Sequence, residues 1–417
     1  MVVSDSVSVF AEGTYEEQIQ ELVNYIVRSQ PEEERAASIL PFQKALKTDE
    51  SQKPIDQDDK RRKKILSMVL TELAALKGFG DGTDKEIEGF FNLIYSHLLT
   101  LYPENSTESK QHLETILKAV SSAPSEQNFV KYRVLSNLFN ALPRTSPLRL
   151  SVYQTLLDIA TSNDELDFLQ LSRADVEYWL EECEVAQEEK SGFLKSIADA
   201  YAKFDQVTIS YTYSLSYLQS LPSSSAEGRK AAINVITTAL RLPSVLDFDA
   251  LFRLDAVVAC KDDELFSLLR VFLSGGLTEF EAWEASHPQV LAKHNLERAQ
   301  LEHKIKLLTL ASLGFKNVGQ DLPYSKIAEA IQVDISEIEK WVIDVIRAGL
   351  LWGKLSQTKQ TLQIIRSTAR TFERDQWEAL EKRLLAWKSG LNNVLEVVAD
   401  ARRQGVHASA QSAAVTV

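Results

Sequence analysis

The chain has 417 residues, of which 44% are hydrophobic and 25% are charged, and its formal net charge is −13. This length accommodates two to three domains with a large core, and the apolar content is ordinary for a globular protein. The negative charge disfavours a general nucleic-acid binder, although a local basic patch can act against the mean. Only Cys183 and Cys260 occur. Their spacing suits neither a metal site nor a secreted disulfide framework, so we expect buried thiols in a reducing compartment.

Targeting and membrane signals are missing from the sequence. The N-terminal residues lack a basic stretch followed by an apolar run, which a signal peptide would need. No segment approaches the ~18 apolar residues of a membrane-spanning helix. We therefore expect a cytoplasmic protein without membrane contact.

Helical periodicity runs through most of the first 300 residues. The expected helices are Tyr15–Arg28, Asp59–Leu76, Asp84–Leu101, Ser109–Val120, Glu126–Leu142, Pro147–Ala160, Arg173–Cys183, Glu188–Phe204, Gln206–Leu218, Glu227–Leu240, Phe248–Leu251, Glu264–Leu273, Leu277–Ala285 and Leu296–Gly314. Short connections containing proline or glycine separate them. Helix pairs of roughly 35–40 residues predict a right-handed stack of helical hairpins. We expect an N-terminal helical region over 1–125 and the helical-repeat part over 126–300.

No motif in the sequence predicts catalysis, a cofactor or a metal. The one glycine cluster, residues 78–82, is followed by no Gly-Lys-Ser/Thr sequence, and no histidine pair has metal-ligand spacing. The basic run at residues 60–64 enters an apolar helix. We interpret it as a solvated first turn in preference to a nuclear localisation signal.

Residues 323–349 have the pattern of a helix-turn-helix. The first helix is expected over Tyr324–Ile331. The second begins at Asp334, whose spacing from Glu337 predicts a capping box. Gly349 stands where a helix needs a left-handed residue. The second helix carries four acidic and two basic residues, a net charge of −2. A helix that reads the major groove of DNA normally has the opposite sign.

Two strands are expected next, over Leu351–Leu355 and Thr361–Ser367, which completes a winged helix within residues 301–372. The edge of such a hairpin exposes backbone groups that another strand can pair with. We expect this edge to bind a partner protein through five residues: Trp352, Lys354, Leu355, Leu362 and Ile364.

The same hairpin contains basic residues and no acid between Leu350 and Phe372. The candidate RNA contacts are Lys354, Lys359, Arg366 and Arg370. A solvated strand face on a small packing domain is the plainer interpretation. Against the net charge of −13, we expect direct nucleic-acid binding by the isolated chain to be weak or absent.

The last helix, expected over residues 373–404, has apolar residues alternately three and four apart. They are Trp377, Leu380, Leu384, Trp387, Leu391, Val394 and Val398. This a/d heptad is narrower than the stripe of a helix that lies on a globular core. It favours association with other helices, in this chain or in partners, and the two tryptophans favour a multi-helix bundle. Residues 405–417 are small and polar, and we expect them to be disordered.

Several strings of residues carry a resemblance. They are VLSNLFN at 134–140, SPLRL at 146–150, NDEL at 163–166, SIADAYA at 196–202, WVIDVIR at 341–347 and KLSQT at 354–358. Together with the order of elements they resemble the PCI-domain family, and within it the m subunits of eukaryotic translation initiation factor 3. The resemblance covers about residues 130–400, and residues 1–120 match weakly.

This resemblance implies a mainly α fold: a helical-repeat (PCI) superhelix, a winged-helix subdomain and a long C-terminal bundle helix. It implies a non-catalytic scaffold subunit, without cofactors, that supports preinitiation-complex assembly on the small ribosomal subunit and mRNA recruitment. In the family, PCI winged helices join edge to edge, and tail helices of several subunits form a bundle. The implied partners are other PCI and MPN subunits, with the small ribosomal subunit reached through the complex.

Three other interpretations remain open. The nearest is a PCI subunit of the signalosome or the proteasome lid, because those proteins share the architecture. A second is a direct nucleic-acid binder acting through the winged helix, which the helix charge of −2 disfavours. An enzyme is the least favoured, because the sequence contains no catalytic motif.

Overall fold

The computed structural model describes residues 13–47, 54–76, 78–103, 106–169, 172–222, 225–371 and 374–414. The chain divides into two compact units, Met1–Pro222 and Ser223–Val417. The division falls inside the predicted helical-repeat part, so the domain limits expected from the sequence remain predictions. Each unit is described by itself.

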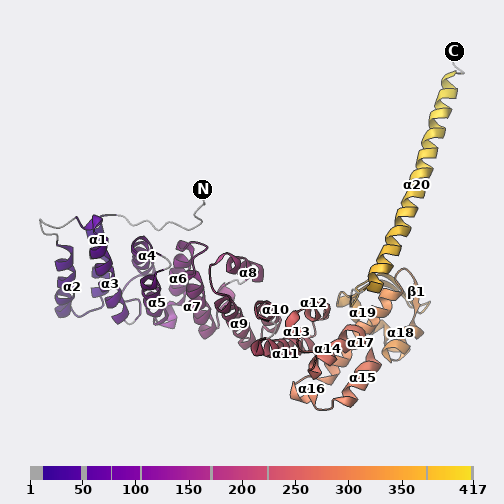
Figure 1. Ribbon diagram of the computed structural model, residues 1–417, viewed down its shortest axis with the longest axis horizontal. Helices are drawn as coiled ribbons and strands as arrows, with labels where there is room; N and C mark the ends of the chain where they lie inside the picture. The colour runs from indigo at the N-terminus through magenta and orange to yellow at the C-terminus, as the bar shows by residue number, and fades with distance from the viewer. Residues whose placement is uncertain are drawn as a thin grey trace. The chain divides into compact units, whose positions relative to one another are not determined.

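The first unit is a succession of helices with short connections (Figure 1). They are α1 (Tyr15–Val27), α2 (Glu32–Leu46), η1 (Ile55–Gln57), α3 (Asp59–Ala75), α4 (Asp84–Leu101), α5 (Thr107–Ser121), η2 (Ser125–Gln127), α6 (Asn128–Ala141), α7 (Leu148–Asn163), η3 (Leu166–Leu169), α8 (Arg173–Glu182), α9 (Gln187–Lys203) and α10 (Val207–Ser220). The helices predicted here are present. Helix α2 was not predicted, because Pro41 interrupts its sequence and only Phe42 is buried on it.

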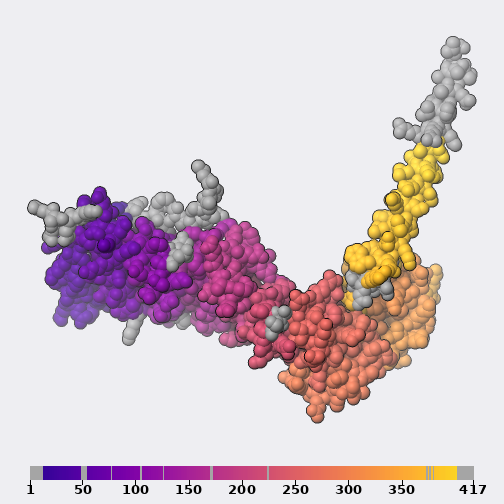
Figure 2. All heavy atoms as spheres, viewed as in Figure 1, coloured from indigo at the N-terminus to yellow at the C-terminus, as the bar shows by residue number. Residues whose placement is uncertain are grey.

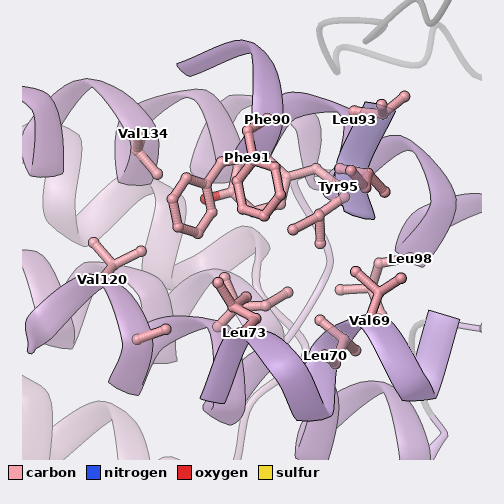
Figure 3. Packing of buried hydrophobic residues seen from close by; sticks show 14 of the residues in the cluster. Val69, Leu70, Leu73, Phe90, Phe91, Leu93, Tyr95, Leu98, Val120 and Val134 are labelled. Carbon is pink, nitrogen blue, oxygen red and sulfur yellow. The ribbon is translucent and has the colours of Figure 1, made fainter. Parts of the chain in front are cut away.

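A continuous hydrophobic core joins α1 to α7. Helix α4 supplies its aromatic part, where Phe90 and Phe91 meet edge to face with 5.3 Å between ring centroids. Figure 3 shows these two rings gathered with Tyr95, with Leu73 of α3 and with Val134 of α6. Each helix therefore buries its apolar face against several others, as stacked helical hairpins require.

The basic run at the start of α3, which we interpreted as a solvated first turn, is only partly exposed and makes internal contacts. The guanidinium of Arg61 donates to the carbonyls of Ala45, in the last turn of α2, and of Lys47, just after it, at 3.0 and 3.1 Å. Arg62 lies over the ring of Tyr15, 4.9 Å from its centroid. These two side chains therefore hold the helices α1, α2 and α3 together.

The second unit contains helices and one small sheet. Its elements are α11 (Ala226–Arg241), α12 (Asp249–Phe252), α13 (Asp255–Val258), α14 (Glu264–Ser274), α15 (Leu277–Ser286), α16 (Val290–Lys293), α17 (Arg298–Lys316), β1 (Asp321–Pro323), α18 (Tyr324–Ile331), η4 (Ile335–Glu337), α19 (Ile338–Arg347), β2 (Leu351–Ser356), β3 (Thr361–Ser367) and α20 (Arg374–Ala414).

A buried lysine joins α17 to the end of α11. The ammonium of Lys304 donates to the carbonyls of Ala239 and Leu240 at 2.7 and 3.1 Å, and it lies 5.3 Å from the ring centroid of Phe248. Burial lowers the pKa of Lys304 to about 7. The lysine satisfies two carbonyls that the end of a helix would otherwise leave unpaired.

The winged helix has its own core, formed by α17, α18, α19 and the sheet. Ile327, Val342 and Leu351 are all fully buried there. The predicted helix over Tyr324–Ile331 is confirmed, and Gly349 has the predicted left-handed conformation with φ of 73°. The capping box predicted for Asp334 is wrong, because its side chain accepts no cap hydrogen bond and a 3-10 turn follows it.

The sheet has three strands in the order β1-β3-β2, with both pairings antiparallel. Strand β1 was not predicted, because three residues ending in Pro323 are too short to show alternation. A bulge lies between Trp352 and Gly353, opposite Arg366 and Ile364, so Ile365 has no opposite residue. Strand β3 is thus the central strand.

Helix α20 has 41 residues and ends at Ala414, beyond the predicted limit of 404. Residues 405–414 contain several alanines and no proline, so they do not stop a helix. Residues 372–373 and 415–417, where the predicted winged helix and the predicted tail end, lie outside the described residues. The predicted fold class is confirmed: mainly α, with stacked helices, a winged helix and a long final helix.

Candidate partner-binding surfaces

Strand β2 forms an exposed edge of the sheet. Ile364 exchanges backbone hydrogen bonds with Gly319 and Gln320 at 2.9 and 3.4 Å, so its backbone groups face the β1 side. Leu362, two residues earlier, faces the same way because backbone groups alternate along a strand. Leu355 is opposite Leu362, and its N–H and C=O therefore point away from β3. Among the described residues no strand covers that side.

Three of the five predicted edge residues are exposed on β2: Trp352, Lys354 and Leu355. The guanidinium of Arg366 lies 3.8 Å from the centre of the Trp352 ring, which is a close cation–π contact. The outer face of the hairpin therefore presents a flat aromatic ring, two cations and an unpaired strand edge.

The other two predicted edge residues belong to the core. Leu362 and Ile364 are almost fully buried and pack against α17, α18 and α19. Strand β1 pairs with β3, so β3 has neighbours on both sides. The prediction that these two side chains contact a partner is corrected, because alternation in a central strand directs them inward.

Arg370 is also placed differently from the prediction. Its guanidinium donates to the carbonyls of Gly275, at 2.8 Å, and Phe272, at the end of α14. A longer contact of 3.5 Å reaches the hydroxyl of Ser312 on α17. Burial lowers the pKa of Arg370 to about 10. This guanidinium is occupied inside the protein, so Arg370 is removed from the candidate RNA contacts.

The remaining basic candidates, Lys354, Lys359 and Arg366, are exposed. Arg366 stacks on Trp352, and none of the three forms an ion pair with a described residue. Three cations on a hairpin form a small patch, and their contact with RNA remains a prediction.

The seven residues of the predicted seam of α20 are all exposed. Figure 2 shows the described part of this helix in yellow. The exposed fractions of its seven residues range from 38% at Leu380 to 71% at Trp387. Leu385, Leu395 and Val397 are exposed as well. Sequence reasoning passed over these three because they lie outside the a and d positions. They widen the seam into a stripe able to contact more than one helix.

The described residues contain no group of three or more metal-ligating side chains, and no helix among them is long and apolar enough to cross a membrane. Burial lowers the pKa of His97 to about 4, so its ring is neutral at physiological pH. Burial also raises the thiol pKa of Cys183 and Cys260, which makes both cysteines poor nucleophiles.

Comparisons with known proteins agree with this arrangement. Residues 285–366 match the PCI domain, and residues 370–398 match the family described as "eIF3 subunit M, C-terminal helix". Three relatives carry the name eukaryotic translation initiation factor 3 subunit M. The protein of Aspergillus terreus is 31% identical over 98% of this chain and 90% of its own length. That of Phaeosphaeria nodorum is 31% identical over 94% and 88%, and that of Aspergillus oryzae is 32% identical over 97% and 89%.

The first 120 residues, where the resemblance is weak, are included in these alignments. The relatives are named as subunits of an initiation factor, in agreement with the prediction that the chain is not an enzyme. The chain therefore belongs to the eukaryotic translation initiation factor 3 subunit M family, within the PCI-domain proteins.

Proposed function

We propose that the chain is a non-catalytic scaffold subunit of eukaryotic translation initiation factor 3, joined to other PCI and MPN subunits through α20 and the edge of β2. The observation that carries this proposal is the stripe of large apolar side chains exposed along α20. Apolar surface on this scale is unfavourable in water, and its burial against partner helices would supply free energy of association.

Within that complex, the chain would support assembly of the preinitiation complex on the small ribosomal subunit and recruitment of mRNA. This role places it in the cytoplasm. The small ribosomal subunit would be contacted through the assembled factor, because the net charge of −13 opposes strong RNA binding by the chain alone.

Truncation tests the role of α20. Removing residues 373–417 should leave a chain that folds cooperatively but no longer co-purifies with initiation factor subunits. The matched control replaces Lys382, Ser389 and Glu396 by alanine. These residues recur every seven positions, opposite the a/d seam, so this variant should assemble normally. A truncated chain that still assembles, or a tagged chain that recovers signalosome or proteasome-lid subunits, would contradict the proposal.

A backbone substitution tests the edge of β2. Leu355→Pro removes an N–H that points away from β3, so the winged helix should keep its fold while pairing with a neighbouring PCI subunit weakens. Leu355→Ala removes the same side chain and keeps the N–H, so it should bind more tightly than Leu355→Pro. Equal binding by both variants, with unchanged melting temperatures, would rule out pairing through this edge.

A further inference from the structure

A groove lies at the base of α20 in the second unit, between this helix, α12 and α14. Its volume of about 840 Å³ is within the range of about 300–1,000 Å³ that ligand pockets in proteins have. Trp377, the first residue of the α20 seam, lines the groove and is 60% exposed. Phe252 of α12 also lines it, and its ring stacks on that of Phe266 with 5.5 Å between centroids. This site, which we call the base groove, therefore contains two aromatic residues, one of which begins the exposed stripe of α20.

One cation in the base groove is unpaired. Arg253 and Asp249, four residues apart, form an ion pair with each other, so their charges cancel. Arg270 of α14 lines the same groove, is exposed, and forms no ion pair with any described residue. Two arginines against one aspartate give the lining a net charge of +1, on a chain whose net charge is −13. An anionic group on a partner would complement this local charge.

We propose that the base groove receives an aspartate or glutamate from the end of a partner helix that packs on α20. The inference rests on the proposed function, in which partner helices cover the apolar stripe of α20. A helix that covers the stripe as far as Trp377 has its end at the groove, because Trp377 belongs to both. Its carboxylate then accepts two parallel hydrogen bonds from the Arg270 guanidinium, whose planar fork matches a carboxylate. Apolar side chains of the same helix end pack on Phe252 and Trp377.

This contact would fix the register of the helical bundle. The seam of α20 repeats every seven residues, so a partner helix displaced by one heptad still covers apolar side chains. A polar contact at a single position selects one register, because it is satisfied in that register alone. The base groove would therefore supply specificity, while the stripe supplies most of the free energy of association.

A carboxylate suits the base groove better than a nucleic-acid phosphate does. A nucleic-acid backbone carries a charge at every nucleotide and needs several cations along its path. The lining of the groove has one arginine that is not already paired. Beyond Trp377 the surface continues into the apolar side chains of the α20 stripe, which suit a protein helix.

Substitution of Arg270 tests the contact. The subcomplex of partner subunits is immobilised, and the affinity of the full-length chain for it is measured by surface plasmon resonance. Arg270→Met removes the cation and keeps a long apolar side chain, so the Kd should rise about tenfold. Arg270→Lys keeps the charge but loses the planar fork, so its Kd should lie between those of the wild type and Arg270→Met. The melting temperature of the free chain should not change, because Arg270 is exposed and unpaired.

Arg229→Met is the matched control, because Arg229 is an exposed arginine of the same unit on α11, outside the base groove. This variant should bind like the wild type. Added salt should weaken the wild type more than Arg270→Met, because only the wild type has the ion pair that salt screens. If Arg270→Met binds as tightly as the wild type while removal of residues 373–417 abolishes binding, the base groove is not used and the role of α20 stands. If the truncated chain binds fully as well, both ideas are wrong.

Crosslinking identifies the occupant. Ser274 lines the base groove and is exposed, so a photo-crosslinking residue at this position in the purified complex should capture the end of a partner helix that contains an aspartate or glutamate. Arg270→Glu alone should abolish the contact, and replacing the captured acidic residue by arginine in the same complex should restore affinity. Capture of RNA, of another segment of this chain, or of a partner segment without an acidic residue would overturn the proposal.

Discussion

Trp387→Ala should weaken assembly strongly while leaving the free chain as stable as before. Trp387 is 71% exposed in the chain alone. A tryptophan side chain buries about 150–250 Å² when it is covered, so a bundle would remove about 140 Å² of additional surface from water. At ~25 cal/mol per Å², this burial contributes about 3.5 kcal/mol. The methyl group of alanine recovers a small part, which leaves a loss of about 3 kcal/mol, or a Kd about 150-fold weaker.

Two measurements on the same variant check this reasoning. Affinity of the purified chain for the subcomplex of its partner subunits should fall by two orders of magnitude in surface plasmon resonance. The melting temperature of the free chain should stay within about a degree of the wild type, since an exposed side chain contributes little to folding. A drop of several degrees would show that Trp387 packs within the chain. An unchanged affinity would show that α20 does not use this position for binding.

The other predictions concern buried charges and the basic hairpin. Arg370→Met should lower the free energy of unfolding by about 2 kcal/mol, because the carbonyls of Gly275 and Phe272 lose their donor. The control Arg366→Met, at an exposed position, should change it by less than about 0.5 kcal/mol. Similar denaturant curves for the two variants would contradict the buried position of the Arg370 guanidinium. Relative to Lys304→Met, the wild type should gain stability as the pH rises above about 7, because the folded chain releases the Lys304 proton at a lower pH than the unfolded chain. If the free energies of unfolding of the two proteins change with pH in parallel, this prediction is wrong. RNA binding by the isolated chain should be weak, and the logarithm of its binding constant should fall with the logarithm of salt concentration with a slope of about −2, for three phosphate contacts through Lys354, Lys359 and Arg366. Submicromolar affinity near physiological salt, lost when all three residues are replaced by glutamate, would instead identify a direct RNA-binding protein.

Elements with strong local signals were predictable. Helix α18 has the bounds expected from its apolar spacing, and the seam of α20 is visible as a heptad repeat. Helix α2 was missed because Pro41 lies inside it, and proline normally ends a helix unless neighbouring packing compensates. Contacts from outside the helix, including the bonds of Arg61 to the carbonyls of Ala45 and Lys47, hold the end of α2, and no local pattern could reveal them.

The same distinction between local signals and distant contacts applies to the predicted site residues. Exposure of Trp352, Lys354 and Leu355 follows from their place on a hairpin edge. The burial of Leu362 and Ile364 depends on β1, a strand of three residues that local alternation cannot detect. Alternation of apolar and polar residues along a strand does not show which strand of the sheet is central. The strand order decides which side chains and which edge are available to a partner.

The position of the Arg370 side chain depends on carbonyl groups about 95 residues earlier in the chain. Charge and position made it resemble its exposed neighbours on the hairpin. Only the tertiary structure brings the end of α14 close enough to accept its hydrogen bonds.

Arg370 also determines how mechanical load would enter the protein. Helix α20 begins four residues after it, so tension along α20 reaches Arg370 before it reaches any strand of the winged helix. The guanidinium holds this point of the chain to α14 and α17 through bonds with Gly275, Phe272 and Ser312. A pull from a helical bundle is therefore delivered to α14 and α17, and the strand edge stays in register while these bonds hold.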